Sequence, residues 1–88
     1  MQVPITDRKQ EIEAEQRLLL KADSDIEAGW NRLQSQQQLL VSLRSAGENT
    51  RDAERLMHAM EETLREWERH RTLIEQRIAY LRSWPNQH

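Results

Sequence analysis

The chain has 88 residues and a formal charge of −2, with 13 basic and 15 acidic residues and no cysteine. This length allows one domain at most, and the balance of charges argues against an electrostatic nucleic-acid binder. The absence of cysteine excludes disulfides and thiol chemistry. Only 36% of the residues are hydrophobic, so we expect the chain to associate in order to cover a thin core.

A cytoplasmic location is predicted from two features that the sequence lacks. The longest apolar run is Leu18-Leu19-Leu20, whereas a membrane span needs about 20 apolar residues. The segment from Met1 to Asp7 lacks the charged-then-apolar order of a signal peptide. We therefore expect no membrane contact.

A first helix is predicted over about residues 7–45, with Thr6 as its N-cap. Apolar residues recur along it every seven positions: Ile5, Ile12, Leu19, Ile26, Leu33 and Leu40. Such a repeat keeps one stripe of a helix facing a partner helix. About half of this seam is apolar and half is small or polar, because the intervening d positions are Arg8, Glu15, Ala22, Gly29, Gln36 and Leu43. This helix therefore looks more like one wall of a bundle than like half of a two-stranded coil.

The only ambiguity in the first helix lies at Ser24. Together with Glu27 it forms a capping box, which could start a new helix. The seven-residue repeat passes from Leu19 to Ile26 without a slip. We therefore expect one continuous helix.

A turn is predicted at about residues 46–50, where Gly47 suits the left-handed position just past a helix end. Thr50 or Asn49 would cap a second helix, which would run over about residues 51–83. Pro85 disfavours helical geometry before it and leaves a short C-terminal tail.

The second helix carries the cleaner apolar seam, because its a and d positions are almost all apolar. These seam residues are Met57, Met60, Leu64, Trp67, Ile74, Ile78 and Leu81. The flanking e positions are all acidic: Glu54, Glu61, Glu68 and Glu75. They form either a charged rim that sets the orientation of a partner or a solvated face.

Folding at Gly47 predicts an all-α, antiparallel helical hairpin in which facing residue numbers sum to about 97. The seam would join Leu19, Ile26, Leu33 and Leu40 to the seam of the second helix. Gly29 would lie opposite Trp67, either to make room for the indole or as a harmless surface glycine. Arg71 either pairs with Asp23 or Glu27, or extends to the edge of the seam.

Residues 26–74 resemble a group of small, uncharacterised helical proteins common in alphaproteobacteria. The distinctive matches are the Gly-x-x-Thr turn of Gly47 and Thr50 and the pair His70-Arg71. The resemblance implies a hairpin but no activity and no cofactor. Relatives often carry a second histidine where this chain has Trp67, which weakens any paired-histidine site.

No residue set predicts catalysis or a bound metal. His58 and His70 are twelve positions apart, which separates them by about 120° around a helix and prevents chelation within one chain. The pairs Glu54–His58 and Glu66–His70 could meet across a dimer, but i,i+4 pairs on a helix surface are the simpler interpretation. We expect no enzyme activity, no metal and no cofactor.

The sequence therefore predicts a non-enzymatic interaction or adaptor module. The hairpin would self-associate, as a homodimer in an antiparallel four-helix bundle, and bind an unidentified protein partner. Trp30, Tyr80 and Trp84 are aromatic beyond what the seams require, so they would either contact that partner or cap the ends of the bundle. The alternatives are a small regulatory nucleic-acid-binding protein and a purely structural spacer.

Overall fold

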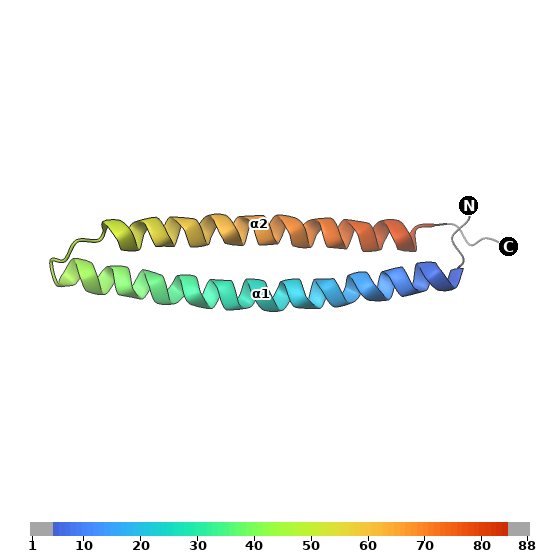
Figure 1. Ribbon diagram of the computed structural model, residues 1–88, viewed down its shortest axis with the longest axis horizontal. Coiled ribbons are helices and arrows are strands. Elements are labelled where there is room, and N and C mark those ends of the chain that lie inside the picture. The colour runs from blue at the N-terminus through green and yellow to red at the C-terminus, as the bar shows by residue number, and fades with distance from the viewer. Residues whose placement is uncertain (1–4, 85–88) are drawn as a thin grey trace.

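The computed structural model describes residues 5–84, which form two long helices side by side (Figure 1). Helix α1 spans Ile5–Ser45 and helix α2 spans Arg51–Arg82. The two run antiparallel, and the molecule is a rod of 70 × 16 × 16 Å. This arrangement confirms the predicted all-α helical hairpin. Because α1 is unbroken through Ser24, the prediction of one continuous helix is confirmed as well.

The start of α1 differs from the prediction, because the helix begins at Ile5 and Thr6 lies inside it. At the other end of the hairpin, α2 stops at Arg82. The N–H of Ser83 bonds the carbonyls of Ala79 and Tyr80, and Pro85 lies outside the described residues.

The turn at Gly47 closes α1 in the way its sequence predicts. Gly47 has a φ of 72°, in the left-handed region that glycine enters without steric cost. Its N–H donates to the carbonyl of Arg44 at 3.1 Å, and the N–H of Glu48 donates to the carbonyl of Leu43 at 2.9 Å. These two bonds form a Schellman motif, which satisfies carbonyls left free at the helix end.

Asn49 is the residue whose side chain serves the start of α2. Its Oδ1 accepts a hydrogen bond from the N–H of Arg51 at 2.9 Å. Thr50 occupies the N-cap position but makes no hydrogen bond through its side chain. Of the two predicted caps, Asn49 therefore satisfies a free donor of the first turn.

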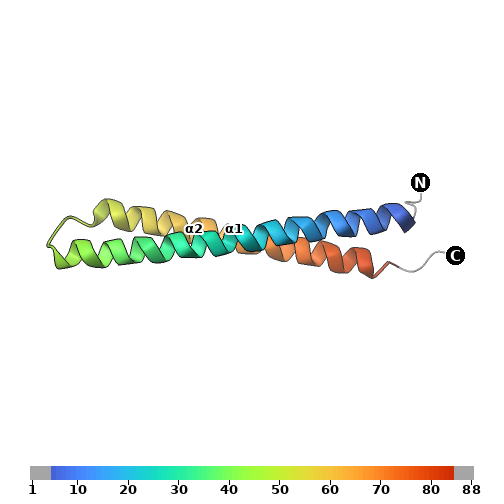
Figure 2. The same ribbon diagram turned by 90° about the horizontal axis from the view of Figure 1, so that it is seen from below.

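The core is a single apolar seam between the helices. Its buried apolar residues are Leu33, Leu40, Leu64, Ile74, Ile78 and Leu81. The two helices wind slowly around each other along the rod, and Figure 2 shows them crossing near its middle. A slow supercoil of this kind is what a seven-residue repeat imposes on helices that would otherwise be straight.

The register differs from the predicted one by about one helical turn. Facing residues have numbers that sum to about 93 rather than 97, as seen for Asp23 with Arg71, Glu15 with Arg77 and Gly29 with Leu64. The cause lies in residues 48–50, which are not helical. An extended residue covers about 3.3 Å of length, against 1.5 Å in a helix, so these residues run back along α1 before α2 begins. Figure 1 shows α2 starting short of the end of α1.

Candidate interaction surfaces

The structure places the eleven predicted seam residues at or beside the contact between the helices. Six of them are buried: Leu33, Leu40, Leu64, Ile74, Ile78 and Leu81. The others are half-buried: Leu19, Ile26, Met57, Met60 and Trp67. The buried polar residues at the d positions of α1 belong to the same seam, so the contact is one long two-helix interface.

Two buried polar side chains of α1 form bonds to α2, a role that their polarity alone did not predict. Gln36 donates from Nε2 to the carbonyl oxygen of Ala53 at 3.0 Å, and Glu15 forms an ion pair with Arg77. Both lie at d positions, which is the signal that could have found them. Polar groups inside an apolar seam disfavour other registers, because a slip would bury them without partners.

Arg71 combines the two predicted alternatives. Its side chain is 34% exposed, and its guanidinium binds Asp23 of α1 and, at 2.9 Å, Glu75 of α2. The hydrogen bond to Asp23 and the charges of both carboxylates raise the pKa of Arg71 above its ordinary value. Arg71 therefore packs its stem beside the seam and joins the helices at its edge.

The predicted glutamate rim is largely engaged within the chain. Glu54 bonds Arg44 of α1 at 3.0 Å, and Glu61 lies 3.3 Å from Nδ1 of His58. His58 pairs with Glu61, and Glu66 pairs with Arg69. Both ion pairs therefore join residues three positions apart. The i,i+4 pairs suggested by the sequence, Glu54–His58 and Glu66–His70, do not occur among these ion pairs.

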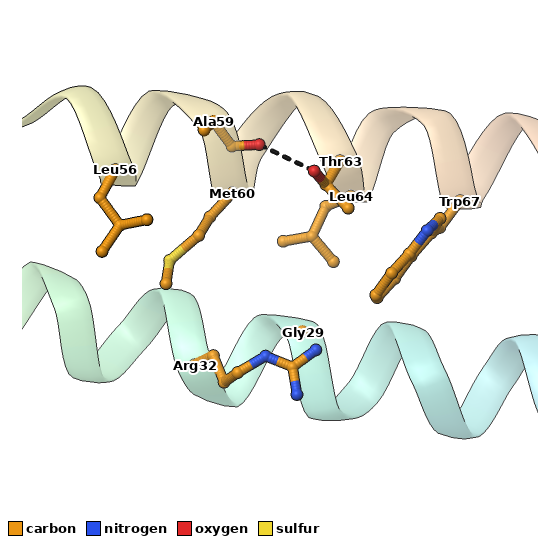
Figure 3. Close-up of a pocket in the computed structure, with 8 residues that line it drawn as sticks. All are labelled: Gly29, Arg32, Leu56, Ala59, Met60, Thr63, Leu64 and Trp67. Atoms are coloured by element: carbon orange, nitrogen blue, oxygen red, sulfur yellow. Dashed lines mark hydrogen bonds between the residues drawn. The ribbon is translucent and has the colours of Figure 1, made fainter.

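A recess opens beside Gly29, on the side of the hairpin shown in Figure 3. It has a volume of about 190 Å³ and is lined mainly by side chains that α2 directs toward α1. These include Leu56, Met60, Leu64 and Trp67. A Cβ atom at Gly29 would lie 2.7 Å from Cδ2 of Leu64 and 3.2 Å from Cζ3 of Trp67. The predicted contact with Trp67 is therefore present, but Leu64 is the closer neighbour.

One side of the rod carries most of its exposed large apolar side chains, and we call this side the apolar flank. It is formed by the heptad g and c positions of both helices, which lie on the same side of an antiparallel pair. Its exposed apolar residues are Leu18, Leu39, Leu56, Leu73 and Tyr80, which are 46–61% exposed. The recess beside Gly29 opens on this flank as well.

The open end of the hairpin carries an aromatic groove of about 410 Å³. Tyr80 and Trp84 meet edge to face with their ring centroids 5.5 Å apart. The guanidinium of Arg8 lies 6.0 Å from the Trp84 ring and donates to the Trp84 carbonyl at 3.3 Å. The groove is lined by Glu11, Ala14, Glu15, Arg77, Tyr80, Leu81 and Trp84. It brings together two of the three predicted partner-binding aromatics.

Trp30 lies apart from this groove. It occupies a heptad e position near the middle of α1 and is 48% exposed. The e positions lie on the side opposite the apolar flank, so the three predicted aromatics do not form one surface.

Comparison with known proteins gives no relative, since no family model, no curated protein and no solved structure matches the chain. Within the described residues, neither helix has a segment long and apolar enough to cross a membrane. Residues 5–84 also hold no cluster of three or more His, Cys, Asp or Glu side chains placed to bind a metal ion.

Proposed function

We propose that this protein is a non-enzymatic interaction module whose hairpin pairs with a second copy and presents a groove to a protein partner. The observation that carries the proposal is the apolar flank, because large apolar side chains concentrated on one side of a molecule mark an interaction surface. The cytoplasm is the proposed location, since a chain without cysteine gains nothing from an oxidising compartment.

The surface area of the chain supports pairing. Its accessible surface is 6936 Å², about 1,500 Å² more than the roughly 5,400 Å² expected for a compact monomer of its 10.5 kDa mass. Permanent dimers bury a total of about 2,000–5,000 Å², to which each partner contributes half. The excess surface is therefore of the size that a permanent dimer would cover.

We expect sedimentation equilibrium at micromolar concentration to give about twice the chain mass of 10.5 kDa. Leu39→Lys, on the apolar flank, should convert the protein to a monomer because the interface would have to bury a lysine ammonium group. Val41→Lys is the matched control, since Val41 is 61% exposed on the opposite side of α1 and its replacement should leave the dimer intact. A wild-type monomer of full helicity would contradict the proposal.

The aromatic groove supports the second half of the proposal. Exposed Trp and Tyr side chains are enriched at sites that dominate binding energy, and the Tyr80–Trp84 pair is held in place by Arg8. Glu11 lines the groove and has no ion-pair partner within the described residues. The groove thus suits a segment with an apolar side chain beside a basic one.

The groove is tested with a library of immobilised peptides that pair an apolar with a basic residue. We expect Trp84→Ala to lower the affinity for the best-binding peptide by at least tenfold, the loss typical of a hot-spot aromatic. Trp30→Ala should leave binding unchanged, because Trp30 lies outside the groove. Equal loss for both variants, or none for Trp84→Ala, would show that this groove is not the binding site.

A further inference from the structure

We propose that the apolar flanks of two copies pack face to face with the hairpins pointing in opposite directions, so that α1 lies along α1 and α2 along α2. The inference rests on the self-association proposed above and specifies its geometry. In this arrangement a two-fold axis crosses the rod at its middle, and each loop lies near the open end of the other copy.

The order of side chains along α1 supports this packing. The g positions of α1 read Glu11, Leu18, Asp25, Arg32 and Leu39. When the two-fold axis lies between Asp25 and Arg32, a residue of α1 faces a residue of the second copy's α1, and their numbers sum to about 57. Leu18 then meets Leu39 of the second copy, and Asp25 meets Arg32 of the second copy.

The same axis also matches the side chains of α2. Residues that face each other within one hairpin have numbers that sum to about 93. An axis at this height therefore requires that facing α2 residues of the two copies have numbers that sum to about 129. Leu56 then meets Leu73 of the second copy, and Asp52 meets Arg77 of the second copy. Two apolar and two oppositely charged pairings thus arise from one choice of axis, and symmetry repeats each of them.

The charged groups involved have the capacity to make these contacts. Arg32 and Asp52 have no ion-pair partner within residues 5–84. Asp25 already binds Lys21 at 3.1 Å, and Arg77 already binds Glu15. A carboxylate has two oxygens and a guanidinium five N–H donors, so each can accept a second partner.

Small residues lie where the two copies would come closest. The axis passes beside Ala28 and Gly29, which add little bulk to α1 at this height. The recess beside Gly29 opens here, so apolar side chains of the second copy have room to enter. Trp84 would lie past the start of the second copy's α2 at Arg51, so the Trp84 end of the groove stays accessible while the second copy covers the Arg77 end.

The alternative packing, with both loops at the same end, fits the charges less well. It would lay α1 of one copy along α2 of the other, again with facing numbers that sum to about 93. The apolar pairs would still match, but Asp25 would lie beside Glu66 of the second copy. Arg32 and Asp52 would face no opposite charge. Charge complementarity therefore selects the opposed orientation.

A disulfide cross-link tests the orientation directly, because the natural chain contains no cysteine. Ala28→Cys should oxidise to a covalent dimer in high yield, since residue 28 faces its own copy only when the hairpins are opposed. Ser42→Cys is the matched control, exposed and on the same row of α1 but far from the axis, and should stay mostly uncross-linked. A dimer in which Ala28→Cys forms no cross-link would overturn this geometry and leave self-association standing.

Reversing the charges gives an independent readout. Asp25→Arg and Arg32→Asp should each raise the dimer Kd about tenfold, because each variant replaces two symmetric attractions with repulsions. The double variant should return the Kd to near the wild-type value. Two single effects that simply add in the double variant would overturn the pairing, whereas a wild-type monomer would instead refute self-association itself.

Discussion

Replacing Leu64 with alanine should cost about 2–5 kcal/mol of unfolding free energy, the range measured for buried leucines. Leu64 is only 2% exposed and lies near the middle of the seam, where a Cβ atom at Gly29 would lie 2.7 Å from its Cδ2. The described core has only six buried apolar residues, so Leu64 is a large share of it. Urea denaturation followed by circular dichroism at a fixed chain concentration measures the loss.

Leu20→Ala is the control for Leu64→Ala. It removes the same atoms from a side chain that is 71% exposed, so its cost should stay below about 0.5 kcal/mol. The fixed concentration matters, because the stability of a self-associating protein rises with concentration. Similar losses for the two variants would mean that the seam lies elsewhere on α2.

Gly29→Ala should fail to stabilise the protein, although alanine favours a helix over glycine by about 1 kcal/mol. The new Cβ would lie 2.7 Å from Cδ2 of Leu64, which is too close for a relaxed contact, and Leu64 is only 2% exposed. Overpacking of this kind typically costs about 1–3 kcal/mol, so the net result is a loss of up to about 2 kcal/mol.

The sign of the Gly29 effect should reverse once Leu64 is shortened. In a Leu64→Ala background the added methyl group has space, so Gly29→Ala should raise stability by about 1 kcal/mol. Trp67→Leu should give a weaker rescue, because the Trp67 ring lies farther from the added Cβ atom, at 3.2 Å. Denaturation of the single and double variants measures this coupling. A stabilising Gly29→Ala in the wild-type background would mean that the helices do not approach closely at Gly29.

The hairpin could be predicted because its signals are local and repeated. Seven-residue spacing set the buried stripe of each helix, and Gly47 marked the reversal between them. The ion pair between Arg71 and Asp23 was one of the alternatives predicted for an arginine in the seam of an antiparallel pair. These inferences needed only helix geometry and the position of one turn.

The register of the two helices could not be predicted, because it depends on a loop that lies outside the seven-residue repeat. Three non-helical residues after Gly47 moved the register by about one turn, so Leu64 became the closest neighbour of Gly29. The aromatic groove was not foreseen as one site, because Arg8 reaches Trp84 across 76 positions of sequence. Seven-residue patterns identify faces, whereas such contacts depend on the accumulated length of both helices.

The single turn at one end of the rod sets the order in which the two helices can join. The contact of Arg44 with Glu54 closes a loop of 10 residues, whereas that of Arg8 with Trp84 closes one of 76. Closing the larger loop alone would cost about 1.8 kcal/mol more chain entropy, but each contact formed from the turn outward shortens the next loop. The helices should therefore pair first near Gly47 and then progressively toward the open end. The aromatic groove should be the last part to form and the first to unfold locally.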